Sequence, residues 1–154
     1  MPLHGEYEPS PEAWVREQVE RYEATDGRES GTLRDTGLPV VIFTTRGSKS
    51  GKLRKIPLMR VEHDGAYLMV ASKGGATSHP LWYHNLRADP EALMVQDGAD
   101  RFDAGARELE GEEREVRWQR AVEAFPPYAE YQRNTNRLIP VLLAERRPST
   151  EKEE

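Results

Sequence analysis

The chain has 154 residues, the size of one domain, with 22 Lys and Arg residues, 27 Asp and Glu residues and a formal net charge of -5. The absence of cysteine excludes disulfides, thiolate metal sites and a cysteine nucleophile. No apolar run approaches the roughly 20 residues of a membrane helix, and the N-terminus lacks the apolar core of a signal peptide. These features predict a single cytoplasmic domain.

The positive charges are concentrated in one segment. Between Thr36 and Val61 there is no acidic residue, and the six basic residues there are Arg46, Lys49, Lys52, Arg54, Lys55 and Arg60. The rest of the chain contains 16 basic and 27 acidic residues. This distribution disfavours a generally basic nucleic-acid-binding protein and favours a single anion-binding site.

The first half of the chain predicts one helix followed by three strands. Ser10-Pro11 is a typical helix start, and apolar residues at helical spacing extend the helix over residues 11–24. Strands are expected at 40–45, 53–61 and 67–71, joined by glycine-containing turns at 47–51 and 63–65. Residues 1–10 are expected to be flexible.

The second half predicts a short helical turn at 80–86, strands at 93–96 and 102–109, an amphipathic helix at 112–125, a short helix at 128–134 and a last strand at 138–144. The predicted fold class is mainly β, an α+β single domain over 11–147. It is an antiparallel barrel or sheet of about six strands with an N-terminal helix and a helical insertion before the last strand. The acidic tail 148–154 is expected to be disordered.

The hairpin turn Gly47–Gly51 is the first candidate site. Its two glycines allow backbone amides to face a ligand beside cationic side chains, which suits a phosphate or several carboxylates. The alternative is an ordinary solvated hairpin face. A nucleotide-binding phosphate loop is disfavoured, because the glycine spacing is one residue short and the turn lies between two strands.

Two further candidates follow along the chain. The segment Ala71–Gly75 brings a strand into a Gly-Gly turn, where a flat ligand can approach the backbone and Ser72 and Lys73 supply a donor and a cation. Phe125, Tyr128 and Tyr131 are spaced by three, which predicts an aromatic stripe. The stripe is either core or the wall of a partly hydrated pocket, and Ser-Lys-Gly-Gly is also compatible with a plain polar loop.

The sequence shows binding residues without an evident acid, base or nucleophile. His79 and His84 are five residues apart, which is not the spacing of a helical metal pair, and no metal site is predicted. No Ser-His-Asp arrangement can be identified. This combination is typical of proteins in which a cofactor performs the chemistry.

Taken in order, these motifs resemble the deazaflavin-dependent nitroreductase family, the F420-dependent oxidoreductases of actinobacteria, which have a split β-barrel fold. The resemblance rests on residues 39–45 leading into 47–58, then on 70–75, 80–86 and Pro127-Tyr128-x-x-Tyr131-Gln132. It implies that reduced coenzyme F420 transfers a hydride to a quinone-like or other electron-poor acceptor.

The resemblance also implies roles for individual residues. The phosphate and glutamate tail of F420 would bind at Lys49, Ser50 and Arg54, with Lys52 and Lys55 adding positive charge. The deazaflavin and its side chain would be surrounded by Pro57, Leu58, Met59, Ala71, Ser72, Lys73, Gly74, Trp82 and Asn85. The substrate would contact Met59, Phe125, Tyr128 and Tyr131, and a proton would come from Tyr128, Tyr131, Ser72 or water.

The sequence departs from the nitroimidazole-reducing branch of the family at two positions. Tyrosines occur there at the positions of Met59 and Phe125, so prodrug reduction is not expected, whereas an apolar pocket still suits a quinone. The alternative functions are an FMN-binding split-barrel oxidoreductase, a non-catalytic F420 carrier and an RNA-binding hairpin. Six cations favour the several anionic groups of F420 over a single phosphate, and the aromatics are not interleaved with the cations as RNA stacking requires.

The helix at 11–24 is open to more than one role. Its polar face includes Glu12, Glu17, Glu20 and Glu23, which disfavours contact with anionic lipid and favours packing on the barrel or a homodimer. Peripheral membrane contact is retained as an alternative, because quinones reside in membranes.

Overall fold

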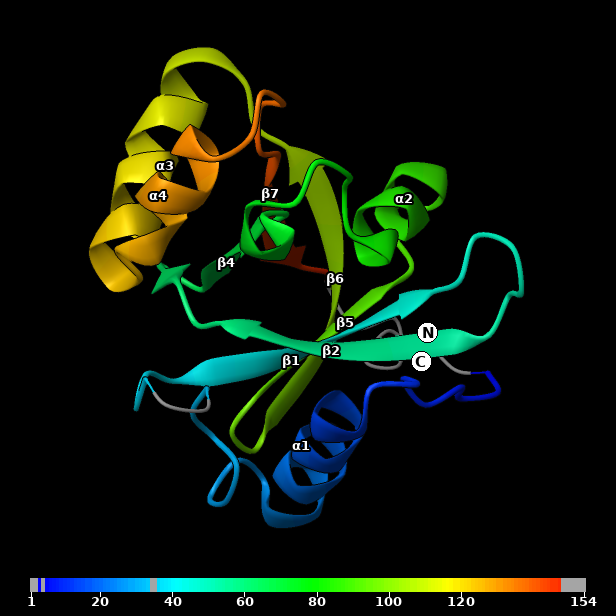
Figure 1. Ribbon diagram of the computed structural model, residues 1–154. Coiled ribbons are helices and arrows are strands. Elements are labelled where there is room, and N and C mark those ends of the chain that lie inside the picture. The colour runs from blue at the N-terminus through cyan, green and yellow to red at the C-terminus, as the bar shows by residue number, and fades with distance from the viewer. Residues whose placement is uncertain (1–2, 4, 34–35, 148–154) are drawn as a thin grey trace.

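The computed structural model describes residues 3, 5–33 and 36–147. Seven strands form one antiparallel sheet in the order β2-β1-β5-β6-β7-β4-β3 (Figure 1). The strands are β1 (Val40–Arg46), β2 (Leu53–Met59), β3 (Glu62–His63), β4 (Ala66–Val70), β5 (Leu93–Asp97), β6 (Asp100–Glu108) and β7 (Val141–Arg146). The helices are α1 (Ala13–Thr25), the 3-10 turn η1 (Lys73–Gly75), α2 (Leu81–Ala88), α3 (Gly111–Ala124) and α4 (Pro127–Arg133).

The two end strands of the sheet, β2 and β3, are consecutive in the chain and are joined only by Arg60 and Val61. The amide of Arg60 donates to the Pro39 carbonyl at 3.0 Å, beside the start of β1. The amide of Leu68, in β4, donates to the Val61 carbonyl at 2.9 Å. The linker therefore bonds to both ends of the sheet, so the sheet curls into the split barrel that the sequence predicted.

Alternating side chains of the strands feed two apolar clusters. On β1, Val40 and Ile42 belong to a cluster that also contains apolar residues of α1, α3 and α4. Val41 and Phe43 belong to a second cluster, which includes Trp82 of α2. Figure 1 shows α1 beside β1 and β2, with α2 apart from it and the pair α3 and α4 near β4. The helices thus cover both faces of the curled sheet.

The predicted helices and strands all form in the predicted order, and their boundaries differ from the observed ones by up to three residues. The helix α1 begins at Ala13, two residues later than predicted, because the Ser10 hydroxyl accepts from the Glu12 amide at 3.1 Å before the helix starts. The predicted strand 53–61 ends at Met59, and β3 forms a seventh short strand.

The last strand begins at Val141 rather than at residue 138, because side chains occupy both backbone groups of Ile139. Its amide donates to Oε1 of Gln132 at 2.9 Å, and its carbonyl accepts from Arg114 at 2.6 Å. The predicted tail 148–154 lies outside the described residues. Within them, no helix is long and apolar enough to cross a bilayer.

A polar network at the closure of the barrel joins the linker between β2 and β3 to β4 and to the end of β5. Arg60 donates from Nε to both carboxylate oxygens of Asp97, at 3.1 and 3.0 Å, and the Tyr67 hydroxyl donates to Oδ2 at 2.6 Å. Burial, and secondly the hydrogen bond to Asp97, raise the pKa of Tyr67, so the phenol stays protonated as a donor. Arg60, counted among the six cations of the predicted site, therefore has a structural role.

Asp97→Asn tests this closure. The substitution removes the charge that both donors share, and we expect the free energy of unfolding to fall by about 1–3 kcal/mol in chemical denaturation. Asp100→Asn is the matched control, because Asp100 pairs with Arg146 at 2.7 Å where both side chains are 52% exposed. A control change below about 0.5 kcal/mol is expected. Equal losses in the two variants would contradict the assigned role of Asp97.

Candidate functional site

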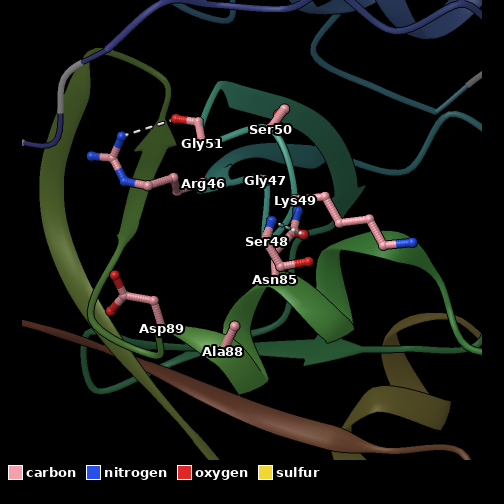
Figure 2. A pocket seen from close by; sticks show the side chains of 9 residues that line it. All are labelled: Arg46, Gly47, Ser48, Lys49, Ser50, Gly51, Asn85, Ala88 and Asp89. Carbon is pink, nitrogen blue, oxygen red and sulfur yellow. Dashed lines mark hydrogen bonds between the residues drawn. The ribbon is translucent and has the colours of Figure 1, made fainter.

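A pocket of about 360 Å³ lies between the β1–β2 turn and the C-terminal end of α2 (Figure 2). Three of the predicted site residues, Lys49, Ser50 and Asn85, line it together. The complete lining is Arg46, Gly47, Ser48, Lys49, Ser50, Gly51, Asn85, Ala88 and Asp89. The turn residues and Asn85, which the resemblance assigned to different parts of the cofactor, therefore line one pocket.

Short hydrogen bonds fix the conformation of the turn. The Gly47 amide donates to the Lys52 carbonyl at 2.7 Å, and the Gly51 amide donates to the Gly47 carbonyl at 2.9 Å. A Cβ at position 47 would lie 2.7 Å from Oγ of Ser50, so only glycine fits there without a shift. Oγ of Ser50 accepts from the Lys52 amide at 3.1 Å, which leaves the hydroxyl proton able to bond a ligand.

Asn85 connects the turn to the body of the barrel. Its Oδ1 accepts from the Ser48 amide at 3.0 Å, and its Nδ2 donates to the Thr45 hydroxyl at 3.1 Å (Figure 2 shows its bond to Ser48). The side chain is buried. Through these two bonds Asn85 holds the turn in position, and its Nδ2 retains a second hydrogen.

Two cations of the turn border the pocket. Arg46 donates from Nη1 to the Gly51 carbonyl at 3.1 Å (Figure 2), which ties the start of the turn to its end. Lys49 is exposed, and among the residues that the structure describes no carboxylate lies within 4 Å of its ammonium group. Lys49 is therefore available to an anionic ligand.

The other cations of the hairpin have intramolecular partners. Lys52 pairs with Glu6 at 3.4 Å and Arg54 pairs with Glu8 at 3.2 Å. The sequence contains no acidic residue between Thr36 and Val61, but acidic residues distant in sequence fold back onto the hairpin and neutralise these cations. The charge pattern alone therefore does not require a ligand at every one of them.

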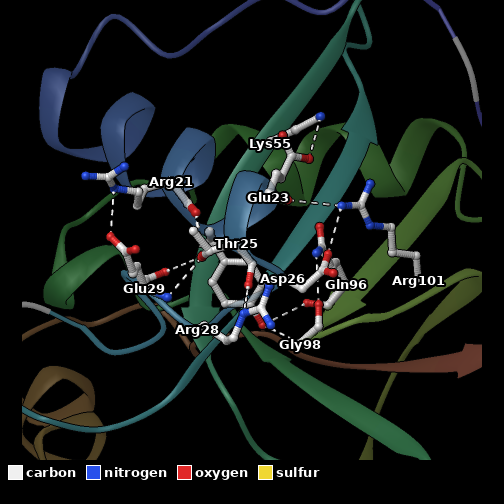
Figure 3. A network of polar contacts seen from close by, with 11 residues as sticks. Arg21, Glu23, Thr25, Asp26, Arg28, Glu29, Lys55, Gln96, Gly98 and Arg101 are labelled. Atoms are coloured by element: carbon white, nitrogen blue, oxygen red, sulfur yellow. Dashed lines mark hydrogen bonds and ion pairs between the residues drawn. The ribbon is translucent and has the colours of Figure 1, made fainter.

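Lys55 differs from Arg54 because adjacent residues of a strand point to opposite faces. Its Nζ lies 2.6 Å from Oε2 of Glu23 in α1 (Figure 3). The same Nζ lies 4.6 Å from the centre of the Tyr7 ring. Arg101 donates to the Glu23 carbonyl at 3.2 Å in the same polar network (Figure 3). Lys55 thus anchors α1 to β2, and it is not among the residues that line the turn pocket.

Arg137 organises the segment that follows β4. It donates to the carbonyls of Ala71 at 3.1 Å, Ser72 at 2.8 Å and Ala76 at 2.8 Å, and its Nη1 lies 3.0 Å from Nδ1 of His79. Burial, and secondly the charge of Arg137, lower the pKa of His79, which favours the neutral ring whose Nδ1 can accept this bond. One guanidinium thus fixes the loop on both sides of η1.

Sequence analysis did not identify Arg137, because a single arginine in a polar stretch has no distinctive pattern. The nearest signal is Gln132, which was part of the aromatic motif. Its Nε2 donates to the Arg137 carbonyl at 2.8 Å, so α4 holds the backbone from which Arg137 reaches the loop.

The predicted aromatic stripe is formed, and it belongs to the same cluster as Met59 of β2. The ring centre of Phe125 lies 4.9 Å from that of Tyr128 and 6.2 Å from that of Tyr131. Tyr128 is only 4% exposed, and burial raises its pKa, whereas Tyr131 is half-buried. The stripe is therefore core at Tyr128 and reaches the surface at Tyr131.

The stripe of Phe125, Tyr128 and Tyr131, called the aromatic wall below, contacts the loop at Gly75. This residue has φ +86°, and a Cβ there would lie 3.1 Å from the Tyr131 carbonyl oxygen, so glycine allows η1 to approach α4 closely. Ser72 is buried and Lys73 is exposed, with Nζ 3.4 Å from the Ser78 hydroxyl; Gly74 continues η1.

The remaining predicted residues lie along β2 or on the other apolar cluster. Pro57 is buried in β2, and Leu58 packs against the cluster that contains Ala71 and Trp82. Leu53 and Met59 are the ends of β2, which spans roughly 20 Å at about 3.3 Å per residue. The strand therefore runs from the cationic turn to the aromatic wall, an arrangement that suits an elongated ligand with an anionic end and a flat end.

In residues 3, 5–33 and 36–147 no group of three His, Asp or Glu side chains is placed to hold a metal ion.

Comparison with known proteins gives a consistent result. The sequence profile described as F420H(2)-dependent quinone reductase matches residues 14–146. An F420H(2)-dependent quinone reductase of Mycobacterium tuberculosis (strain H37Rv) is 34% identical over 129 residues, which cover 82% of this chain and 85% of the relative.

Two solved structures are also similar. One, described as an F420-H2 dependent reductase (FDR-A), has 62% sequence identity and a TM-score of 0.66, and the match covers 70% of this chain and 94% of that chain. The other, described as a domain-swapped dimer, has 56% identity and a TM-score of 0.68 over 88% of this chain and all of that chain.

Arg137→Gln tests the organisation of the η1 loop. Glutamine cannot make the four contacts of the guanidinium, so we expect faster amide hydrogen exchange in residues 71–79 and a loss of about 1–3 kcal/mol in the free energy of unfolding. Arg133→Gln is the control, because Arg133 is exposed at the end of α4. Unchanged exchange in residues 71–79 of Arg137→Gln would contradict the role assigned to Arg137.

Proposed function

Because this chain belongs to the F420H(2)-dependent quinone reductase family, we propose that it is an F420H2-dependent oxidoreductase that reduces a quinone. The observation that carries the proposal is the family match over residues 14–146, which spans the turn pocket, the η1 loop and the aromatic wall. The arrangement of these parts along β2 is independent support, because it suits an elongated anionic cofactor with a flat ring.

The residues at the turn suit the anionic end of F420. Lys49 is exposed beside the 360 Å³ pocket, and Ser50 retains a hydroxyl proton for a phosphate or carboxylate oxygen. Lys52 and Arg54 follow at the start of β2 and extend the positive surface. Asn85 contributes through the Ser48 amide, by keeping the turn in its binding conformation.

The opposite end of β2 suits the deazaflavin ring. The bound coenzyme supplies the hydride, and the work of the protein is orientation, which contributes several kcal/mol to rate enhancement in well-positioned reactions. We assign the backbone at Ala71–Gly74, held by Arg137, to one side of the ring. Pro57, Leu58 and Trp82 provide apolar contacts for it.

The acceptor is assigned to the aromatic wall. Met59 and Phe125 are apolar and buried, so they exclude water and favour a quinone over a polar acceptor. Tyr131 is the better candidate for the proton donor, because it reaches the surface while burial raises the pKa of Tyr128. Ser72 is a second candidate, since Arg137 bonds the backbone carbonyl of Ser72 and not its hydroxyl.

Two further features of the function are proposed. The similar structure described as a domain-swapped dimer supports a homodimer for this chain as well. Reduction of a membrane quinone would also require peripheral contact with a bilayer, at a surface that avoids the glutamates of α1.

The direct test is to mix the purified protein with F420H2 and menaquinone. The return of the absorbance of oxidised F420 measures the reaction. We expect turnover that requires both the protein and the quinone. Binding of F420 without turnover for any quinone would instead identify a carrier, and a tightly bound yellow flavin would identify an FMN enzyme. Either result would contradict the proposed function.

Lys49→Ala tests the cofactor assignment of the turn. Because an exposed ion pair contributes about 0–1 kcal/mol, we expect F420 affinity to fall by up to about fivefold in a fluorescence titration, with little change in stability. Arg120→Ala on α3 removes an equal charge from an exposed position and is the control. Equal affinities in the Lys49→Ala variant and the control would contradict a role for Lys49 in cofactor binding.

A further inference from the structure

The N-terminal segment 6–8, here called the acidic arm, adds to the edge of β2. The Leu53 amide donates to the Glu6 carbonyl at 2.7 Å, and the Glu8 amide donates to the Leu53 carbonyl at 2.9 Å. Tyr7 and Leu53 form a parallel bridge. A segment expected to be flexible is therefore aligned along the first residues of the strand that carries the cations.

This alignment places two carboxylates on the cations. Residues two apart in an extended segment point to the same side, at a separation of about 7 Å. The carboxylate of Glu6 is 3.4 Å from Nζ of Lys52, and that of Glu8 is 3.2 Å from Nη1 of Arg54. The acidic arm thus presents regularly spaced side-chain carboxylates, the same chemistry as an oligoglutamate chain.

We propose that Glu6 and Glu8 are specificity-determining residues that compete with the glutamate tail of F420 for Lys52 and Arg54. The proposal rests on the proposed function, which brings a tailed cofactor to this hairpin. Binding of the tail exchanges one carboxylate partner for another at each cation, so the number of ion pairs is unchanged. The acidic arm therefore reduces the advantage of a tailed cofactor over a tail-free one.

The exposure of these pairs makes the exchange feasible. The side chains of Lys52 and Glu6 are 42% and 73% exposed, and such pairs are weak because water screens them. Among the described residues, two backbone hydrogen bonds and the contact between the Tyr7 ring and Lys55 hold the acidic arm to β2. The pair between Lys55 and Glu23 is different, since it is shorter, at 2.6 Å, and its side chains are 20% and 26% exposed, so it stays in place.

The test is a fluorescence titration of the double variant Glu6→Gln/Glu8→Gln with two ligands. The first is F420 with its glutamate tail, and the second is the tail-free form, which keeps the phosphate but carries no glutamates. We expect the tailed form to bind about 3- to 20-fold more tightly than to the unmodified protein, and the tail-free form to change by less than about 2-fold. The control Glu112→Gln/Glu123→Gln removes the same charge from exposed positions on α3 and should bind both forms as before.

A double-mutant cycle separates direct competition from a general change in charge. In an Arg54→Gln background, Glu8→Gln has no cation to release, so it should change affinity for the tailed form by less than about 1.5-fold. An equal gain for both ligands, a gain that persists without Arg54, or no gain would overturn the proposal while F420 binding itself stands. Failure of the unmodified protein to bind either form would overturn the proposed function and, with it, this proposal.

Discussion

The closure of the barrel at Arg60 and Val61 is the constraint on which the rest of the structure depends. These two residues join the end strands of the sheet. Asp97 accepts from Arg60 and from the Tyr67 hydroxyl, and the Val61 carbonyl accepts from the Leu68 amide. The closure fixes the course of β2, whose first residues meet the cationic turn and whose last residue meets the aromatic wall. The functional site is consequently spread along one strand, and its two ends are positioned by the same backbone.

The turn and the η1 loop are each held by a polar side chain that acts through backbone groups. At the turn, Asn85 bonds the Ser48 amide, and at the η1 loop Arg137 bonds three carbonyls. Both residues join elements that are far apart in the chain. Such contacts leave the exposed groups of the loops free for a ligand, because the rigidity comes from the buried side. The site can therefore be preorganised by contacts on the buried side of its loops.

Local patterns explain why most of the fold was predictable. The β-branched run that became β1, the Asp-Gly turns and the helical spacing of α1 and α3 depend on neighbours in sequence. The polar partners were not predictable in this way. Arg54 and Glu8 are 46 residues apart, and Arg137 and Ser72 are 65 apart, so only the folded topology brings them together. The interruption of the predicted strand at Arg60 likewise follows from the tertiary closure.

The basic segment shows how these long-range contacts change the function that is inferred from a charge pattern. A run of cations indicates a ligand only to the extent that the folded chain leaves it unneutralised. Arg60 and Lys55 are committed to structure through Asp97 and Glu23, and Lys49 is the exposed cation at the pocket. Lys52 and Arg54 lie between these two cases, because each forms an ion pair that is weak and whose glutamate is exposed. A ligand with several carboxylates can therefore bind Lys49 directly, but it reaches Lys52 and Arg54 only by competing with Glu6 and Glu8.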